Sequence, residues 1–284
     1  MKSARKPRQI FRPNPVLGWS LTPGETVEVS YRDNVVQHIG DDGWRIVSGQ
    51  SESSGIILGL YGCSFIYGTG LRDSETLASL VQAEFPEITV MNRGIGGHSS
   101  VQNLLQFRRD LEAGRVSAAI FGIISNHRYR NIPHPARMRM LQSLEWQELG
   151  IEHVPIARQN RSSELEIDYL PIWQPALSRS DFDAFLPNAH MIDMATVAVL
   201  SEIVEVGNRA GVHTLFALLD QTDPEFNDQL LSAFTNCKDV STPNDADHSF
   251  RPFDAHPNAL SNQIFAERLI PHVGQMIAGR LTSV

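Results

Sequence analysis

The chain has 284 residues and a formal net charge of −8, because 24 Lys and Arg residues face 32 Asp and Glu residues. This acidic excess argues against nucleic acid or an anionic membrane as the main partner. Hydrophobic residues make up 42% of the chain, as in an ordinary globular protein with a sizeable core. The two cysteines are too few for a disulfide framework or a cysteine-based metal site.

The amino terminus carries the only notable basic cluster of the chain, Lys2, Arg5, Lys6, Arg8 and Arg12. A solvated tail is the simplest interpretation of this cluster. No apolar region of signal-peptide length follows it, and no stretch of about 18 apolar residues occurs anywhere in the chain. We therefore expect a cytoplasmic protein without a spanning helix.

Residues 13–55 are rich in proline, glycine and polar residues. Within them, the segment 26–31 alternates between polar and apolar residues, which predicts an edge strand, and 41–43 predicts a turn. We expect residues 1–55 to form an amino-terminal extension and a small β-rich lead-in.

From residue 56 onward, apolar runs alternate with segments of helical periodicity. The expected strands are 56–61, 88–92, 117–124 and 212–219, and the expected helices are 74–85, 99–113, 192–210, 224–235 and 259–279. Near-continuous apolar runs suit central parallel strands that are buried on both faces. The pattern predicts, for residues 56–284, a three-layer α/β/α sandwich with a mostly parallel, flavodoxin-like sheet.

Residues 128–190 interrupt this alternation. They are rich in proline, arginine and aromatic residues, and the segments 151–156 and 166–173 could form a hairpin. A long connection of this kind often serves as a lid or specificity insertion. A contact between protein copies is an equal alternative, so the oligomeric state stays open.

The turn Gly62-Cys63-Ser64-Phe65 follows the first apolar strand and precedes a helix that we expect to begin at Asp73 or Ser74. A serine at the carboxyl end of such a strand lies where open α/β sheets bind their ligands. Backbone N–H groups of a turn can also stabilise an oxyanion there.

Three later blocks follow strands or precede the last helix: Asn92-Arg93-Gly94-Ile95-Gly96-Gly97-His98, Ser125-Asn126-His127, and Phe253-Asp254-Ala255-His256-Pro257-Asn258. The carboxyl ends of parallel strands meet at one edge of the sheet. We therefore expect these blocks and Ser64 to converge on one crevice.

The four blocks in this order resemble the SGNH (GDSL-type) hydrolases. That family has a Gly-Asp-Ser turn, an Asn-x-Gly-x-x-Gly loop, a Gly-x-Asn-Asp stretch and an Asp-x-x-His-Pro or Asp-x-His-Pro segment. The resemblance covers roughly residues 56–127 and 250–270. Cys63 and His127 stand where the family usually has aspartates.

The resemblance implies a role for five residues. Ser64 would be the nucleophile, His256 its general base and Asp254 the carboxylate that orients the imidazole. The oxyanion hole would comprise the backbone N–H groups of Ser64 and Gly97 and the side-chain amide of Asn126. The resemblance implies no metal and no organic cofactor.

Each of these residues also has a simpler interpretation. Ser64 could belong to an ordinary turn, Gly97 could be only a turn former, Asn126 could cap a helix and His256 could lie on the surface. Cys63 invites a thiol nucleophile, although buried cysteines more often act as small hydrophobes. His98 and His127 are expected near the pocket mouth. The arginines Arg128, Arg130, Arg137 and Arg139 suggest a solvated face, or a rim for an anionic substrate.

The pattern as a whole predicts a serine hydrolase that cleaves a carboxylic ester of a small or carbohydrate-linked acyl group. An O-acyltransferase with the same site and a non-catalytic binding module on the same fold remain as alternatives.

Overall fold

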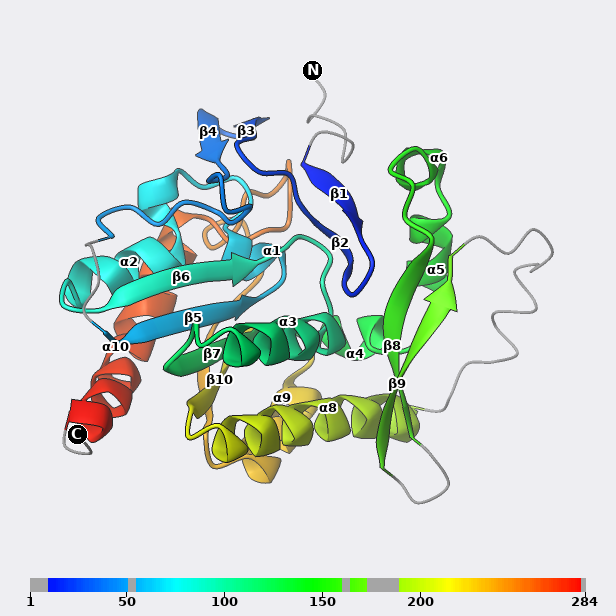
Figure 1. Ribbon diagram of the computed structural model, residues 1–284. Coiled ribbons are helices and arrows are strands. Elements are labelled where there is room, and N and C mark those ends of the chain that lie inside the picture. The colour runs from blue at the N-terminus through cyan, green and yellow to red at the C-terminus, as the bar shows by residue number, and fades with distance from the viewer. Residues whose placement is uncertain (1–9, 51–54, 160–163, 173–188, 282–284) are drawn as a thin grey trace.

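The structure, a computed structural model, describes residues 10–50, 55–159, 164–172 and 189–281. Its centre is a five-stranded sheet of order β11-β10-β7-β5-β6, in which all paired strands run parallel (Figure 1). The strands are β5 (Ile57–Gly62), β6 (Thr89–Gly94), β7 (Ala118–Ile123), β10 (His213–Asp220) and β11 (Cys237–Thr242). This order is that of flavodoxin-like sheets, as predicted, and their ligand crevice lies between the first and third strands, here β5 and β7.

Helices cover both faces of the sheet. α2 (Leu77–Glu84) and α10 (Ala259–Leu281) pack on one face, and α3 (Ser100–Glu112), α8 (Ala189–Arg209) and α9 (Pro224–Ala233) pack on the other. Every residue of β7 is buried, and successive residues such as Ile120 and Phe121 enter opposite cores. Because side chains alternate along a strand, a strand buried on both faces must be apolar throughout.

The predicted strands and helices of this domain occur within a few residues of their expected bounds. The sequence did not predict β11, an edge strand in which Lys238 and Asp239 interrupt the apolar pattern. The expected helix start at Asp73 or Ser74 is also wrong. A short 3-10 helix, η2 (Asp73–Glu75), occupies that place, and α2 begins after Thr76, whose Oγ1 accepts a hydrogen bond from Ser79 N.

The amino-terminal segment forms two antiparallel hairpins, β1 (Phe11–Asn14) with β2 (Gly18–Leu21), and β3 (Thr26–Ser30) with β4 (Asn34–His38). The alternation predicted for the segment 26–31 is confirmed, since Val27 and Val29 point inward and their neighbours are exposed. The predicted turn is confirmed as well, with a hydrogen bond from Gly43 N to Gly40 O. Four members of the basic cluster, Lys2 to Arg8, lie outside the described residues.

The interruption after β7 contains α4 (His127–Arg130), α5 (Pro135–Leu141), α6 (Leu144–Gln147) and the hairpin of β8 (His153–Gln159) with β9 (Leu165–Pro171). The predicted hairpin is therefore present, although Trp173 at its expected end lies outside the described residues. Apolar residues from this interruption share a third core with the amino-terminal hairpins. In this core, Trp146 of α6 packs against Trp19 with ring centroids 4.9 Å apart. Within the described ranges, none of the helices combines the length and the hydropathy that crossing a bilayer requires.

Candidate active site

Ser64 lies directly after β5, at the carboxyl edge of the sheet. It is the first residue of α1 (Ser64–Tyr67), a single helical turn, and it is 7% exposed. The bend before it requires a glycine, because a Cβ on Gly62 would lie 2.4 Å from Ile66 Cγ1. Cys63 precedes the helix and is fully buried, which fits its interpretation as a small hydrophobe.

Asp254 and His256 form a hydrogen-bonded pair in the loop before α10. Asp254 Oδ1 lies 2.5 Å from His256 Nδ1 and accepts a second hydrogen bond from His256 N at 2.7 Å. Partial burial raises the pKa of Asp254, but the hydrogen bonds and charge of His256, with a hydrogen bond from Tyr31, outweigh it and lower the pKa to about 2. The carboxylate is therefore ionised at neutral pH, and His256 Nε2 remains for another partner.

The amino-terminal segment holds this loop in place. Tyr31 donates its hydroxyl hydrogen bond to Asp254 Oδ2 at 3.0 Å, and burial together with the charge of Asp254 raises the pKa of Tyr31. Arg32 donates hydrogen bonds to the carbonyl oxygens of Ala246, Ser249 and Arg251. The loop that carries Asp254 and His256 is thus attached to residues more than 200 positions earlier in the chain.

His256 also lies close to the serine turn. Its ring contacts that of Phe65 edge-to-face, with centroids 5.8 Å apart, and Phe65 follows Ser64 directly. Among the described residues, Ser64 Oγ makes no hydrogen bond to His256. The structure therefore pairs Asp254 with His256 and places His256 against Phe65, the residue after Ser64. It shows no hydrogen bond between the described side chains of His256 and Ser64.

The loop after β6 places Gly97 near the same edge. Gly97 has a φ of +79°, a conformation that favours glycine, and a Cβ there would lie 3.3 Å from Trp19 Cζ2. Trp19 Nε1 donates to the carbonyl oxygen of Gly96 at 3.0 Å, so the first hairpin fixes this loop. No hydrogen bond between described residues uses the backbone N–H of Ser64 or Gly97, which leaves both donors available to a ligand.

Asn126 follows β7 and is exposed. It occupies the position before α4, but its side chain makes no capping hydrogen bond to that helix. The preceding Ser125 is fixed by two hydrogen bonds to Asp220 Oδ1, at 2.9 Å from its N and 3.0 Å from its Oγ. The segment that carries Asn126 is therefore anchored to the end of β10, at the carboxyl ends of the strands, and the amide of Asn126 does not serve as a helix cap.

His98 and His127 do not lie at a pocket mouth, contrary to expectation. Both are almost fully buried. Burial lowers the pKa of His98 to about 3 and that of His127 well below 6.5, with a further contribution from the positive charges of Arg130 and Arg137. Both imidazoles are therefore neutral at pH 7, and neither ring nitrogen of His127 has a hydrogen-bond partner among the described residues.

The arginine run is not a solvated face either, except at Arg139, which is exposed. Arg128 pairs with Asp193 at 3.1 Å and with Asp223. Arg130 donates to His98 O at 3.1 Å, and Arg137 is buried with its pKa lowered to about 9 by burial and by Arg130. The sequence misleads here because these helices are covered by other parts of the fold.

Solved structures of similar fold include three that span most of this chain. A psychrotrophic esterase from Pseudoalteromonas sp. is 12% identical, with 78% of this chain and 98% of that chain covered and a TM-score of 0.45. A member of the lipolytic protein G-D-S-L family from Veillonella parvula is 13% identical, with coverages of 76% and 97% and a TM-score of 0.44. A catalytic mutant of an acetylxylan esterase from Geobacillus stearothermophilus is 13% identical, with coverages of 78% and 95% and a TM-score of 0.42.

No protein-family model matches the chain, and no curated protein matches it. The roles of individual residues therefore rest on the geometry of this chain.

Sequence reasoning did not find Tyr31, Arg32 and Trp19, which hold the site loops from the amino-terminal hairpins. Tyr31 ends the alternating segment 26–31, but periodicity says nothing about a partner more than 200 residues away. Only the packing of the hairpins against the sheet edge brings these residues to the site.

Proposed function

We propose that the chain is a serine ester hydrolase with Ser64 as nucleophile, His256 as general base and Asp254 as orienting carboxylate. The observation that carries the proposal is the Asp254–His256 pair, whose imidazole lies against the residue beside Ser64. A carboxylate on Nδ1 fixes the tautomer that leaves Nε2 free to take a proton. Hydrogen bonds between nucleophile and base often tighten only when substrate binds, so we expect the Ser64–His256 hydrogen bond to form with the ester bound.

In the proposed reaction, Ser64 Oγ attacks the ester carbonyl carbon while its proton passes to His256 Nε2. The N–H groups of Ser64 and Gly97 and the amide of Asn126 stabilise the oxyanion. The carbon–oxygen bond to the alcohol then breaks, and the alcohol takes the proton from His256. Water, deprotonated by the same imidazole, then attacks the acyl carbon. The bond from this carbon to Ser64 Oγ breaks, Oγ takes the proton from His256, and the acid leaves.

The test compares Ser64→Ala with Ser74→Ala, an exposed serine in η2, on p-nitrophenyl acetate. We expect Ser64→Ala to lose at least about 10³-fold in kcat/KM, since the nucleophile is removed, and Ser74→Ala to match wild type. A fluorophosphonate probe should label Ser64. The proposal is wrong if Ser64→Ala hydrolyses the ester as fast as wild type. It is also wrong if Cys63→Ala loses activity while Ser64→Ala keeps it. A protein that binds esters without a Ser64 adduct would be a binding module instead.

A further inference from the structure

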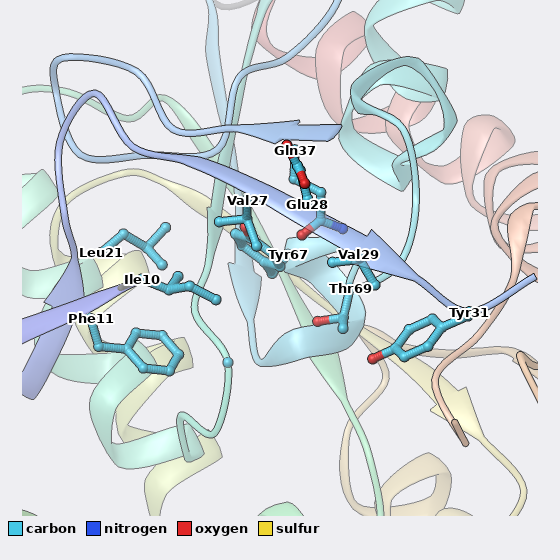
Figure 2. A pocket seen from close by; sticks show the side chains of 11 residues that line it. Ile10, Phe11, Leu21, Val27, Glu28, Val29, Tyr31, Gln37, Tyr67 and Thr69 are labelled. Atoms are coloured by element: carbon cyan, nitrogen blue, oxygen red, sulfur yellow. The ribbon is translucent and has the colours of Figure 1, made fainter. Parts of the chain in front are cut away.

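A partly enclosed pocket of about 120 Å³ lies between the amino-terminal hairpins and α1 (Figure 2). Its apolar walls are Ile10, Phe11, Leu21, Val27, Val29 and the ring of Tyr67. In Figure 2, Ile10, Phe11 and Leu21 lie on one side of the pocket, and Thr69 and Tyr31 lie on the other. Most of the exposed wall is apolar, so the pocket suits a hydrocarbon group.

The residues that line the pocket are linked to three parts of the candidate active site, namely the serine turn, the loop of Gly97 and the loop of Asp254. Tyr67 is the last residue of α1, the helix that begins with Ser64, and Thr69 N donates to Ser64 O at 3.1 Å. Gly96 lines the pocket and precedes Gly97 in the oxyanion loop. Tyr31 lines it too, while its hydroxyl group binds Asp254.

The amino-terminal segment is what closes this pocket. A Cβ on Gly96 would lie 3.2 Å from Phe11 Cζ, so the first hairpin rests directly on the oxyanion loop. Val27 and Val29 are the two inward-facing residues of β3 and form the wall between the first hairpin and Tyr31. Without residues 10–31, this side of the sheet edge would lack its apolar wall.

We infer that this pocket binds the acyl chain of the ester, and that the chain is longer than acetyl. The inference rests on the proposed function, since it names the substrate of that site. A dry apolar cavity of roughly 150 Å³ holds a benzene-sized molecule, so this pocket fits a chain of about four to six carbons. The alcohol must leave and water must enter before the acyl-enzyme is hydrolysed. An enclosed pocket therefore suits the group that stays attached to Ser64.

The experiment measures kcat/KM for the p-nitrophenyl esters of acetate, butyrate and hexanoate, which share one leaving group. Wild type should prefer butyrate to acetate by about tenfold, because two more methylenes are buried. Val29→Phe fills the pocket and should lower the hexanoate-to-acetate ratio by about tenfold. Val36→Phe, an exposed position on the paired strand β4, is the matched control and should leave the ratio unchanged.

The outcomes separate the pocket from the proposed reaction. If wild type cleaves no ester and Ser64 is not labelled, the proposed function fails. Calorimetric binding of hexanoate that is lost in Val29→Phe and kept in Val36→Phe would then still support the pocket, and equal binding in both would overturn it.

In an active enzyme, a preference of wild type for acetate would also overturn the inference. So would an equal loss of kcat/KM on all three esters in Val29→Phe. Methyl acetate and hexyl acetate differ only in the alcohol. If Val29→Phe lowers kcat/KM for hexyl acetate relative to methyl acetate, the pocket binds the alcohol and the inference is wrong.

Discussion

The hydroxyl group of Tyr31 donates a hydrogen bond to Asp254 Oδ2 at 3.0 Å and so connects the end of β3 to the loop that carries His256. Asp254 Oδ1 is already used by His256, so Tyr31 fixes the other oxygen of the same carboxylate. Arg32 strengthens the connection at the carbonyl oxygens of that loop. The amino-terminal hairpins are therefore part of the support of the candidate site, beyond forming a lead-in to the α/β domain.

Tyr31→Phe removes this hydrogen bond and keeps the ring that lines the pocket. Since hydrogen bonds to charged groups contribute about 1.5–3 kcal/mol, we expect kcat/KM to fall by about ten- to a hundredfold, mainly through kcat. Tyr169→Phe, on an exposed position of β9, is the control and should have no effect. Steady-state kinetics with both variants provide the measurement. Unchanged kinetics in Tyr31→Phe would indicate that Tyr31 acts only as a pocket wall.

Asp254→Asn is expected to lower kcat by about 10³-fold, because a neutral amide stabilises neither the required tautomer nor the imidazolium. The pKa of Asp254 is lowered to about 2 in the folded protein from 3.8. A lowered pKa stabilises the fold above 3.8, and this stabilisation is lost as the pH falls from 3.8 to about 2.

Urea unfolding at pH 5 and pH 2.5 therefore tests the same variant independently of catalysis. The difference in free energy of unfolding between wild type and Asp254→Asn should shrink at the lower pH. Asp228→Asn, on an exposed position of α9, should show no such change. A constant difference for Asp254→Asn would contradict the ionised pair.

Gly97→Ala should reduce both stability and activity. At a φ of +79°, an alanine costs about 1–2 kcal/mol of unfolding free energy. Gly114, at a φ of +63° with open space around its Cβ position, is the matched control for this backbone cost. Alanine keeps the N–H of Gly97 but displaces it, since its Cβ would lie 3.3 Å from Trp19 Cζ2. If that N–H binds the oxyanion, only Gly97→Ala should also lose kcat, by up to about 10²-fold. Equal activities in the two variants would remove Gly97 from the oxyanion hole.

His127→Leu should change the response of stability to pH. Burial lowers the pKa of His127 well below 6.5, so the unfolded chain takes up a proton there that the folded protein does not. Stability is therefore full above pH 6.5 and falls as the pH drops below it, by about 1 kcal/mol per pH unit for one such group.

Urea unfolding at pH 7.5 and pH 5 measures this slope. His127→Leu should lose less stability between the two values than wild type, while the exposed control His213→Leu should behave as wild type does. At pH 7.5 the variant should be at least as stable as wild type, because it removes two buried nitrogens that have no hydrogen-bond partner in the described part of the chain. An unchanged slope would show that His127 is protonated in the fold.

The sequence by itself determined the α/β/α architecture and four of the five strands of the main sheet, because buried parallel strands are continuous apolar runs. The five residues of the proposed site come from the resemblance of four sequence blocks to known hydrolases, and their roles stay a prediction. The sequence also predicted the alternation of β3 and the hairpin of β8 with β9. These are local patterns, written in the spacing of neighbouring residues.

Only the tertiary structure decided which distant segments support and surround the site. It placed Tyr31 on Asp254 and Trp19 on Gly96, and it buried His127 and Arg137, which the sequence suggested lie at a pocket mouth and on a solvated face. The physical reason is that burial and long-range hydrogen bonds depend on what covers a residue. That cover comes from distant segments, such as the first hairpin, whose Trp19 ring lies against the Arg137 guanidinium group. Periodicity records only which side of its own element a residue occupies.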